Sequence, residues 1–303
     1  MPTRIMEPTV IEVRGLTKTF GAHTAVDDVS FTAPTGRVTG FLGPNGAGKT
    51  TTLRCLLGLA APTAGSALIN GKPYDQLDQP RRQVGALLES TGFHPGRSGR
   101  NHLRVIARAA GIDASRIEPL LDLVGLRGAA NRRVGGYSLG MRQRLGLATA
   151  LLGDPGVLVL DEPANGLDPA GVSWIRQLLR HWAEEGRTVL VSSHYLAEIA
   201  QVVDQVVIIR DGGIVADTDI AELTTSRVTV RVDRVEPMLA ALRADGITHD
   251  LLADGSVAIA GRDAADIGAI AAGAGVTVTE LRGLSAGESL EAMFLTVTAG
   301  EQR

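Results

Sequence analysis

The chain has only one cysteine, Cys55, and it has neither a long apolar run nor an excess of basic charge. A single cysteine excludes an internal disulfide, and the first residues lack the charged-then-apolar pattern of a secretory leader, so we expect a cytoplasmic protein. A membrane helix needs roughly 18 uninterrupted apolar residues. The richest apolar stretches, around 202–209, are broken by Asp204 and Arg210. Any membrane attachment is therefore expected to come through a partner.

The charge balance argues against a nucleic-acid partner. The formal net charge is -3, whereas proteins that bind a phosphate backbone normally carry a basic excess. With 44% apolar and 21% charged residues, the composition is that of a folded globular protein. The length of 303 residues favours two domains, at roughly 150 residues for each.

The pattern over residues 10–223 predicts an α/β domain with a mostly parallel sheet. Three apolar runs are typical of buried strands: Val38–Leu42, Val157–Leu160 and Thr188–Val191. Each leads into a polar or glycine-rich turn, and ligands of parallel sheets bind beyond the carboxyl ends of the strands. Between about residues 90 and 152 helical spacing replaces the strand pattern, which predicts a helical subdomain inserted into the sheet domain.

In residues 224–303 short predicted strands alternate with predicted helices, which indicates a small α+β domain. The sequence does not indicate the role of this domain. Strands are expected at Arg227–Val232, Val257–Ile259 and Val276–Leu281, with helices at Pro237–Ala244 and Ala264–Ala272. This order is loosely that of a ferredoxin-like half-repeat.

The segment from Gly43 to Thr50 matches the phosphate-binding P-loop pattern, follows a predicted strand and opens a predicted helix that runs to about Leu59. Its backbone N–H groups and the helix N-terminus favour phosphate oxygens. Lys49 is expected to reach the β- and γ-phosphates of a bound nucleotide, and the Thr50 hydroxyl to bind Mg²⁺. A P-loop alone leaves kinases, GTPases and many ATPases open. The alternative is a glycine-rich turn that matches by chance. The candidate ATP-binding residues are Gly43, Asn45, Gly46, Ala47, Gly48, Lys49, Thr50 and Thr51.

Two adjacent carboxylates, Asp161 and Glu162, end the predicted strand Val157–Leu160. Alternation along a strand directs them differently. Asp161 is the candidate Mg²⁺ ligand and Glu162 the candidate general base for an attacking water. Alone, such a pair is more often a helix cap or a solvated turn, but the P-loop favours the catalytic interpretation.

The run Tyr137-Ser138-Leu139-Gly140-Met141, just upstream of the acidic strand, resembles the signature of the ABC ATPases. The family form is Leu-Ser-Gly-Gly-Gln, so Ser138 and Gly140 match, while Tyr137, Leu139 and Met141 depart from it. A capped helix start at Ser138 is the alternative interpretation, and the two are compatible. The resemblance implies that these two residues act in trans, because the signature helix of one subunit points at the γ-phosphate held by the other. It also implies a P-loop ABC fold with antiparallel N-terminal strands beside the parallel sheet and the helical subdomain.

Further positions resemble ABC motifs in the family's order. Asn165-Gly166-Leu167-Asp168 is similar to the D-loop, with Asp168 at the dimer contact, and His194 is similar to the switch histidine. Phe20 stands where the family places an aromatic that stacks on adenine, although a core role would also suit it. Alone, His194 would more often be a surface or core residue, but its place after a buried strand and Ser192-Ser193 favours a contact with the γ-phosphate.

Glu89 occupies the position where the family has the Q-loop glutamine, and a carboxylate there can still approach Mg²⁺ or water. The surrounding run 87–95 and the tail 289–295 resemble the bacitracin-resistance branch, whose ATPases serve ABC-2-type exporters. The resemblance implies a homodimer that lies beneath a separate transmembrane permease, on the inner face of the cell membrane. This homodimer is expected to couple ATP-driven dimerisation to the export of a drug, an antibiotic or a lipid.

Three other functions fit the sequence less well. An ABC-type ATPase of DNA repair or chromosome organisation should carry a long coiled-coil insertion, and an ABC-type translation factor should carry two ATPase cassettes. This chain has a short helical region and one P-loop. An ATP-sensing regulatory module is disfavoured by the complete set Lys49, Asp161, Glu162 and His194.

Overall fold

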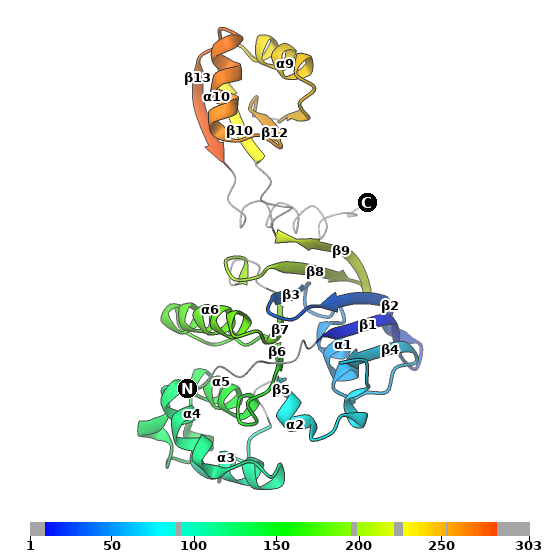
Figure 1. The fold of residues 1–303 in the computed structure, drawn as a ribbon, viewed down its shortest axis with the longest axis vertical. Coiled ribbons are helices and arrows are strands. Elements are labelled where there is room, and N and C mark those ends of the chain that lie inside the picture. The colour runs from blue at the N-terminus through cyan, green and yellow to red at the C-terminus, as the bar shows by residue number, and fades with distance from the viewer. Residues whose placement is uncertain (1–9, 89–91, 195–198, 221–226, 253, 284–303) are drawn as a thin grey trace. The chain divides into compact units, whose positions relative to one another are not determined.

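The computed structural model describes residues 10–88, 92–194, 199–220, 227–252 and 254–283. The chain divides into two compact units, residues 1–217 and residues 218–303. Figure 1 labels their elements, and each unit is described by itself below. Among the described residues, no helix has both the length and the hydropathy that crossing a membrane requires.

A six-stranded sheet forms the centre of the first unit, in the order β5-β6-β7-β3-β8-β9. The neighbouring pairs from β5 to β8 are parallel. Every residue of β3, β6 and β7 is buried, as expected for parallel strands covered on both faces. These three are the strands that the apolar runs predict. The sheet consists of β3 (Val38–Leu42), β5 (Val84–Leu87), β6 (Val157–Asp161), β7 (Thr188–Ser193), β8 (Gln205–Arg210) and β9 (Gly213–Asp219).

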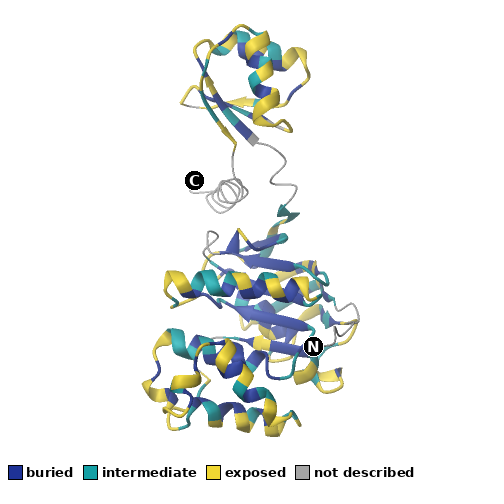
Figure 2. Ribbon diagram, turned by 60° about the vertical axis from the view of Figure 1, so that its left-hand side comes forward, coloured by how far each residue is buried: buried dark blue, intermediate teal, exposed yellow. Residues whose placement is uncertain are grey.

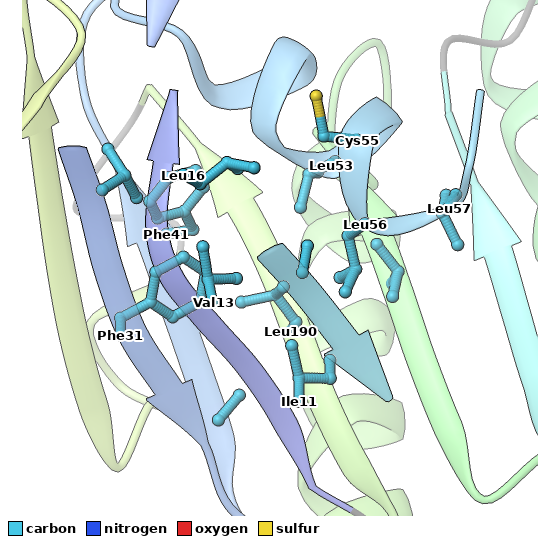
Figure 3. Packing of buried hydrophobic residues seen from close by; sticks show 14 of the residues in the cluster. Ile11, Val13, Leu16, Phe31, Phe41, Leu53, Cys55, Leu56, Leu57 and Leu190 are labelled. Atoms are coloured by element: carbon cyan, nitrogen blue, oxygen red, sulfur yellow. The ribbon is translucent and has the colours of Figure 1, made fainter. Parts of the chain in front are cut away.

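A second, antiparallel sheet in the order β2-β1-β4 lies beside helix α1. Its strands are β1 (Ile11–Phe20), β2 (His23–Ala33) and β4 (Ala64–Ile69), and α1 spans Lys49–Leu56. Figure 3 shows Leu53 and Leu56 of α1 packed among the apolar side chains of the strands, including Ile11 and Leu190. The predicted end of this helix, near Leu59, is wrong, since Gly58 adopts a left-handed conformation and ends it earlier.

Helices dominate residues 99–150, where the sequence predicts a helical subdomain. Serine side chains cap two of them: Ser98 accepts from the Asn101 N–H, and Ser138 accepts from the Met141 N–H. Figure 2 shows buried stripes along their inner faces. The segment comprises α3 (Gly99–Ala109), α4 (Ile117–Leu123), α5 (Leu139–Ala150) and the short 3₁₀ turns η2 (Ala114–Arg116), η3 (Arg127–Ala129) and η4 (Val134–Gly136).

The remaining elements of the first unit connect these layers. Helix α6 begins at Pro169, directly after its cap Asp168, and buries one face. Asp154, before β6, pairs with Arg116 and Arg187. Burial disfavours its ionised form, but these arginines more than offset that effect and lower the pKa of Asp154. The connecting elements are η1 (Tyr74–Gln76), α2 (Pro80–Gln83) and α6 (Pro169–Glu184).

The second unit is a four-stranded antiparallel sheet in the order β11-β12-β10-β13, with two helices. Read along the chain, the order β-α-β-β-α-β with this strand arrangement is the complete ferredoxin-like pattern rather than a half-repeat. The sequence pattern does not predict β11, because this strand has three residues and no apolar alternation. The elements are β10 (Arg227–Val232), α9 (Val235–Ala244), β11 (His249–Leu251), β12 (Val257–Ala260), α10 (Ala264–Gly273) and β13 (Val278–Gly283). The tail 289–295 lies outside the described residues.

Candidate ATP site

The P-loop joins β3 to α1, as its pattern predicts. Gly48 precedes α1 with a φ of 107°, a conformation that residues with a Cβ rarely adopt. A Cβ at Gly48 would also lie 2.5 Å from the Ala25 carbonyl oxygen. The Ala47 N–H donates to the Pro44 carbonyl at 3.2 Å, so this amide is engaged within the loop. The loop is therefore tightly folded around its glycines.

The Lys49 side chain is buried at the centre of the loop, only 6% exposed. Its ammonium donates to the carbonyl oxygens of Gly43 at 2.7 Å and Pro44 at 3.2 Å. It also lies 3.5 Å from Glu162 Oε1. Burial lowers the pKa of Lys49, although Glu162 and Asp161 favour its charged form. The Lys49 side chain therefore ends at the carboxyl end of β3, next to the Glu162 carboxylate.

Asp161 ends β6 and is almost fully buried. The Thr50 hydroxyl donates to Asp161 Oδ2 at 2.7 Å, and the Ser192 hydroxyl donates to Oδ1. Mg²⁺ prefers few protein oxygens, keeping waters and substrate phosphates as its other ligands. The hydroxyl and carboxylate of this pair fit that requirement. Among the described residues, no group of three or more His, Cys, Asp or Glu forms a denser metal site.

The carboxylate of Glu162 lies between two of the predicted partners. Its Oε2 atom is 2.8 Å from His194 Nδ1, while Oε1 faces Lys49. The backbone of Glu162 has a φ of 49°, which is rare for a residue with a side chain. Its N–H donates to the carbonyl and the hydroxyl of Ser192, at 3.2 and 3.1 Å. The candidate base and the candidate switch histidine are therefore in direct contact.

A cleft of about 550 Å³ opens over these groups. Phe20 lines it and is 53% exposed, so the alternative of a core role for this ring is wrong. The ammonium of Lys18 lies 4.8 Å from the centre of the Phe20 ring. His23 and Ala25 of β2 also line the cleft, although the sequence did not predict them as site residues. The predicted site residues that line it are Phe20, Asn45, Gly46, Gly48, Lys49, Thr50, Thr51, Asp161 and Glu162.

The segment that resembles the signature starts α5 in the same chain. Ser138 is the N-cap, and Leu139 reaches the cleft wall. A Cβ at Gly140 would lie 3.3 Å from the Gly166 carbonyl, so the start of α5 packs against the loop that follows Glu162. Asp168 caps α6 by accepting from the Gly171 N–H at 2.9 Å. The trans roles of Ser138, Gly140 and Asp168 stay predictions, and Glu89 lies outside the described residues.

Two residues of the site are not predicted as site residues from the sequence. Ser192 connects Asp161 to the backbone of Glu162, and Gln143 donates from Nε2 to the Glu162 carbonyl at 2.9 Å. The available signal for Gln143 is its spacing, since it lies four residues after Leu139 and therefore on the same face of α5. For Ser192, the signal is its place at the end of a buried strand next to β6.

Two protein-family models match parts of the chain. A family described as "ABC transporter" matches residues 26–165. A second model, described as a domain of unknown function (DUF8746), matches residues 226–291. Among solved structures, a protein titled as the ATP-binding subunit of an ABC transporter superposes with a TM-score of 0.65 at 29% identity, covering 71% of this chain and 91% of the other. A dimeric bacterial ABC transporter cassette gives a TM-score of 0.64 at 23% identity, covering 69% of this chain and 98% of that one.

Curated relatives show the same relationship. The bacitracin transport ATP-binding protein BcrA of Enterococcus faecalis is 40% identical over 217 residues, which cover 71% of this chain and 70% of the relative. The lantibiotic transport ATP-binding protein SrtF of Streptococcus pyogenes is 36% identical over 210 residues, or 69% of this chain and 91% of the relative. With the P-loop, the acidic strand end and this shared fold, the chain belongs to the family of ABC transporter ATP-binding proteins.

Proposed function

We propose that this chain hydrolyses ATP and uses the cycle of binding and hydrolysis to drive export through a separate transmembrane permease. The observation that carries the proposal is the contact of Glu162 with both Lys49 and His194, next to the Thr50–Asp161 pair. One cleft therefore contains a cation that can bind phosphate, a carboxylate that can accept a proton from water, and two oxygen ligands for a metal.

In the proposed reaction, the carboxylate of Glu162 accepts a proton from water as the water oxygen attacks the γ-phosphorus. The bond between the γ-phosphorus and its bridging oxygen breaks, and ADP leaves with the electron pair. Lys49 holds the phosphate oxygens, and His194 orients the carboxylate. Thr50 and Asp161 are the proposed ligands of Mg²⁺, which would neutralise phosphate charge. The triphosphate first has to replace Glu162 as the partner of Lys49.

We further propose that two copies close around two ATP molecules. Ser138 and Gly140, at the N-terminus of α5, are then available to the γ-phosphate bound by the other copy, because a helix N-terminus favours anions. One chain carries both half-sites, so a homodimer has two complete sites. Closure and reopening would move the permease. Phe20 is the proposed platform for adenine, and Asp168 the proposed D-loop contact.

The proposed cargo is a drug, an antibiotic or a lipid, and the proposed partner is a permease of the ABC-2 class at the inner face of the membrane. Support comes from the relatives, whose names assign bacitracin and lantibiotic transport to them. Attachment through a permease is also in keeping with the described helices, none of which can cross a membrane.

Two measurements test the proposal. Purified protein should release phosphate from Mg-ATP, and Lys49→Ala should abolish this release. Binding of ATP without phosphate release would instead indicate an ATP-sensing module.

Affinity capture from detergent-solubilised host membranes should recover a polytopic permease. Recovery of soluble or DNA-associated proteins alone would contradict the transport function.

A further inference from the structure

The residue proposed as the general base has an unfavourable backbone conformation. Glu162 has a φ of 49°, in the left-handed region that side chains with a Cβ rarely occupy. Such a conformation persists only where the surrounding structure holds it, and it is found most often at functional sites. The position of the Glu162 carboxylate therefore depends on what holds its two peptide groups.

The peptide groups on both sides of Glu162 are held from different elements. The N–H is fixed by Ser192 on β7, through its carbonyl and its hydroxyl. The carbonyl accepts from the Asn165 N–H at 3.1 Å, within the same loop, and from Gln143 Nε2 at 2.9 Å. Gln143 is only 4% exposed. Its amide is thus the contact that ties this carbonyl to a helix outside the loop.

A second contact joins the same face of α5 to the same loop. Gly166 has a φ of 75°, and a Cβ placed there would lie 2.2 Å from Cδ2 of Leu139. Leu139 and Gln143 are four residues apart and lie on one face of the helix. The first turns of α5 therefore contact the loop 162–166 at its beginning and near its end.

We propose that Gln143 is a positioning residue for the catalytic carboxylate of its own chain. By holding the Glu162 carbonyl, it keeps the left-handed backbone that directs the carboxylate toward His194. Without this donor, Glu162 can relax to a more common conformation, and its carboxylate moves away from the attacking water. The inference rests on the ATP hydrolysis proposed above.

Two variants remove the donor while keeping the size of the side chain. Gln143→Met fills the buried space without a hydrogen bond, and Gln143→Leu does so with a branched apolar side chain that cannot donate either. A displacement of about 1 Å can lower a rate a hundredfold. We expect kcat for ATP to fall by about tenfold to a hundredfold, with the KM for ATP and the melting temperature nearly unchanged. The matched control is Gln177→Met on the exposed face of α6, which should behave as wild type.

Mixed dimers distinguish this role from an effect of α5 on the opposite subunit. In the first mixed dimer, one subunit carries Gln143→Met and the other carries Glu162→Gln. The only remaining base is then Glu162 of the subunit that lacks Gln143. In the other, both changes are in one subunit, so the remaining site keeps Gln143 beside its own base. We expect the first dimer to lose most activity and the second to retain about half of the wild-type rate, because one of two sites is intact.

Unchanged kcat in both Gln143 variants, or loss confined to the second mixed dimer, would overturn the proposal. So would a parallel change of kcat, KM and melting temperature in both variants, which would make Gln143 a packing residue. If wild-type protein releases no phosphate, the proposed hydrolysis fails and this inference with it. If wild type is active and the Gln143 variants match it, only the positioning role fails.

Discussion

The substitution Glu162→Gln tests the proposed chemistry most directly. Glutamine keeps the size of the side chain, so the contact between its Oε2 position and His194, 2.8 Å in this structure, can persist. It removes the carboxylate that accepts the proton of the attacking water. General-base catalysis contributes about 10²- to 10⁴-fold, and we expect kcat to fall by this factor.

The same substitution should not weaken ATP binding. Glu162 Oε1 lies 3.5 Å from the Lys49 ammonium, and the two side chains are 21% and 6% exposed. At an effective dielectric constant of about 20, such a pair attracts by about 5 kcal/mol, of which desolvation offsets a large part. The γ-phosphate has to displace this contact. Its removal should therefore leave ATP affinity equal to or higher than that of wild type.

Three measurements on Glu162→Gln complete the test: steady-state phosphate release, equilibrium ATP binding, and size-exclusion chromatography with saturating Mg-ATP. We expect slow release, retained binding and an ATP-dependent dimer. Glu184→Gln, at the exposed end of α6, is the control and should match wild type. Turnover within tenfold of wild type would refute the assignment of the base, and a monomer under saturating Mg-ATP would refute the symmetric dimer.

Three further changes probe the site and the fold. Gly48→Ala should lower the free energy of unfolding by about 1–3 kcal/mol in chemical denaturation, because it combines a left-handed φ with a backbone clash, whereas Gly128→Ala, with open space around it, should have little effect. Phe20→Ala should weaken ATP binding in calorimetry by about tenfold, since stacking on a base contributes about 1–3 kcal/mol; an exposed ring predicts no change in melting temperature. Asp154→Asn should flatten the acid limb of the stability curve. The pKa of Asp154 is lower in the folded state, since its two arginine partners outweigh burial, so its stabilisation is present above the unfolded pKa and lost as pH falls through the folded pKa. Equal loss of stability in wild type and variant between pH 7 and pH 3 would contradict this.

Local patterns were sufficient for much of the fold. The three fully buried strands of the central sheet are short, mostly apolar runs. The P-loop pattern, with a strand before it and a helix after it, predicted the start of α1. Glu162 and His194 each follow one of these strands. Because the carboxyl ends of parallel strands meet at one edge of the sheet, the sequence predicted that both residues lie there. The short strand β11 has no such signal, and the end of α1 depends on the conformation of a single glycine.

The sequence by itself determined the chemical inventory: a lysine in a glycine-rich loop, two carboxylates and a histidine at strand ends, and a serine that caps a helix. Only the tertiary structure decided how these groups hold one another. Gln143 contacts Glu162 across 19 positions, and Ser192 contacts Asp161 across 31. Such contacts depend on which strands are neighbours and on how closely α5 packs, and no local periodicity encodes either. The left-handed backbone of Glu162 is likewise a product of the packing, because its own residue type disfavours that conformation.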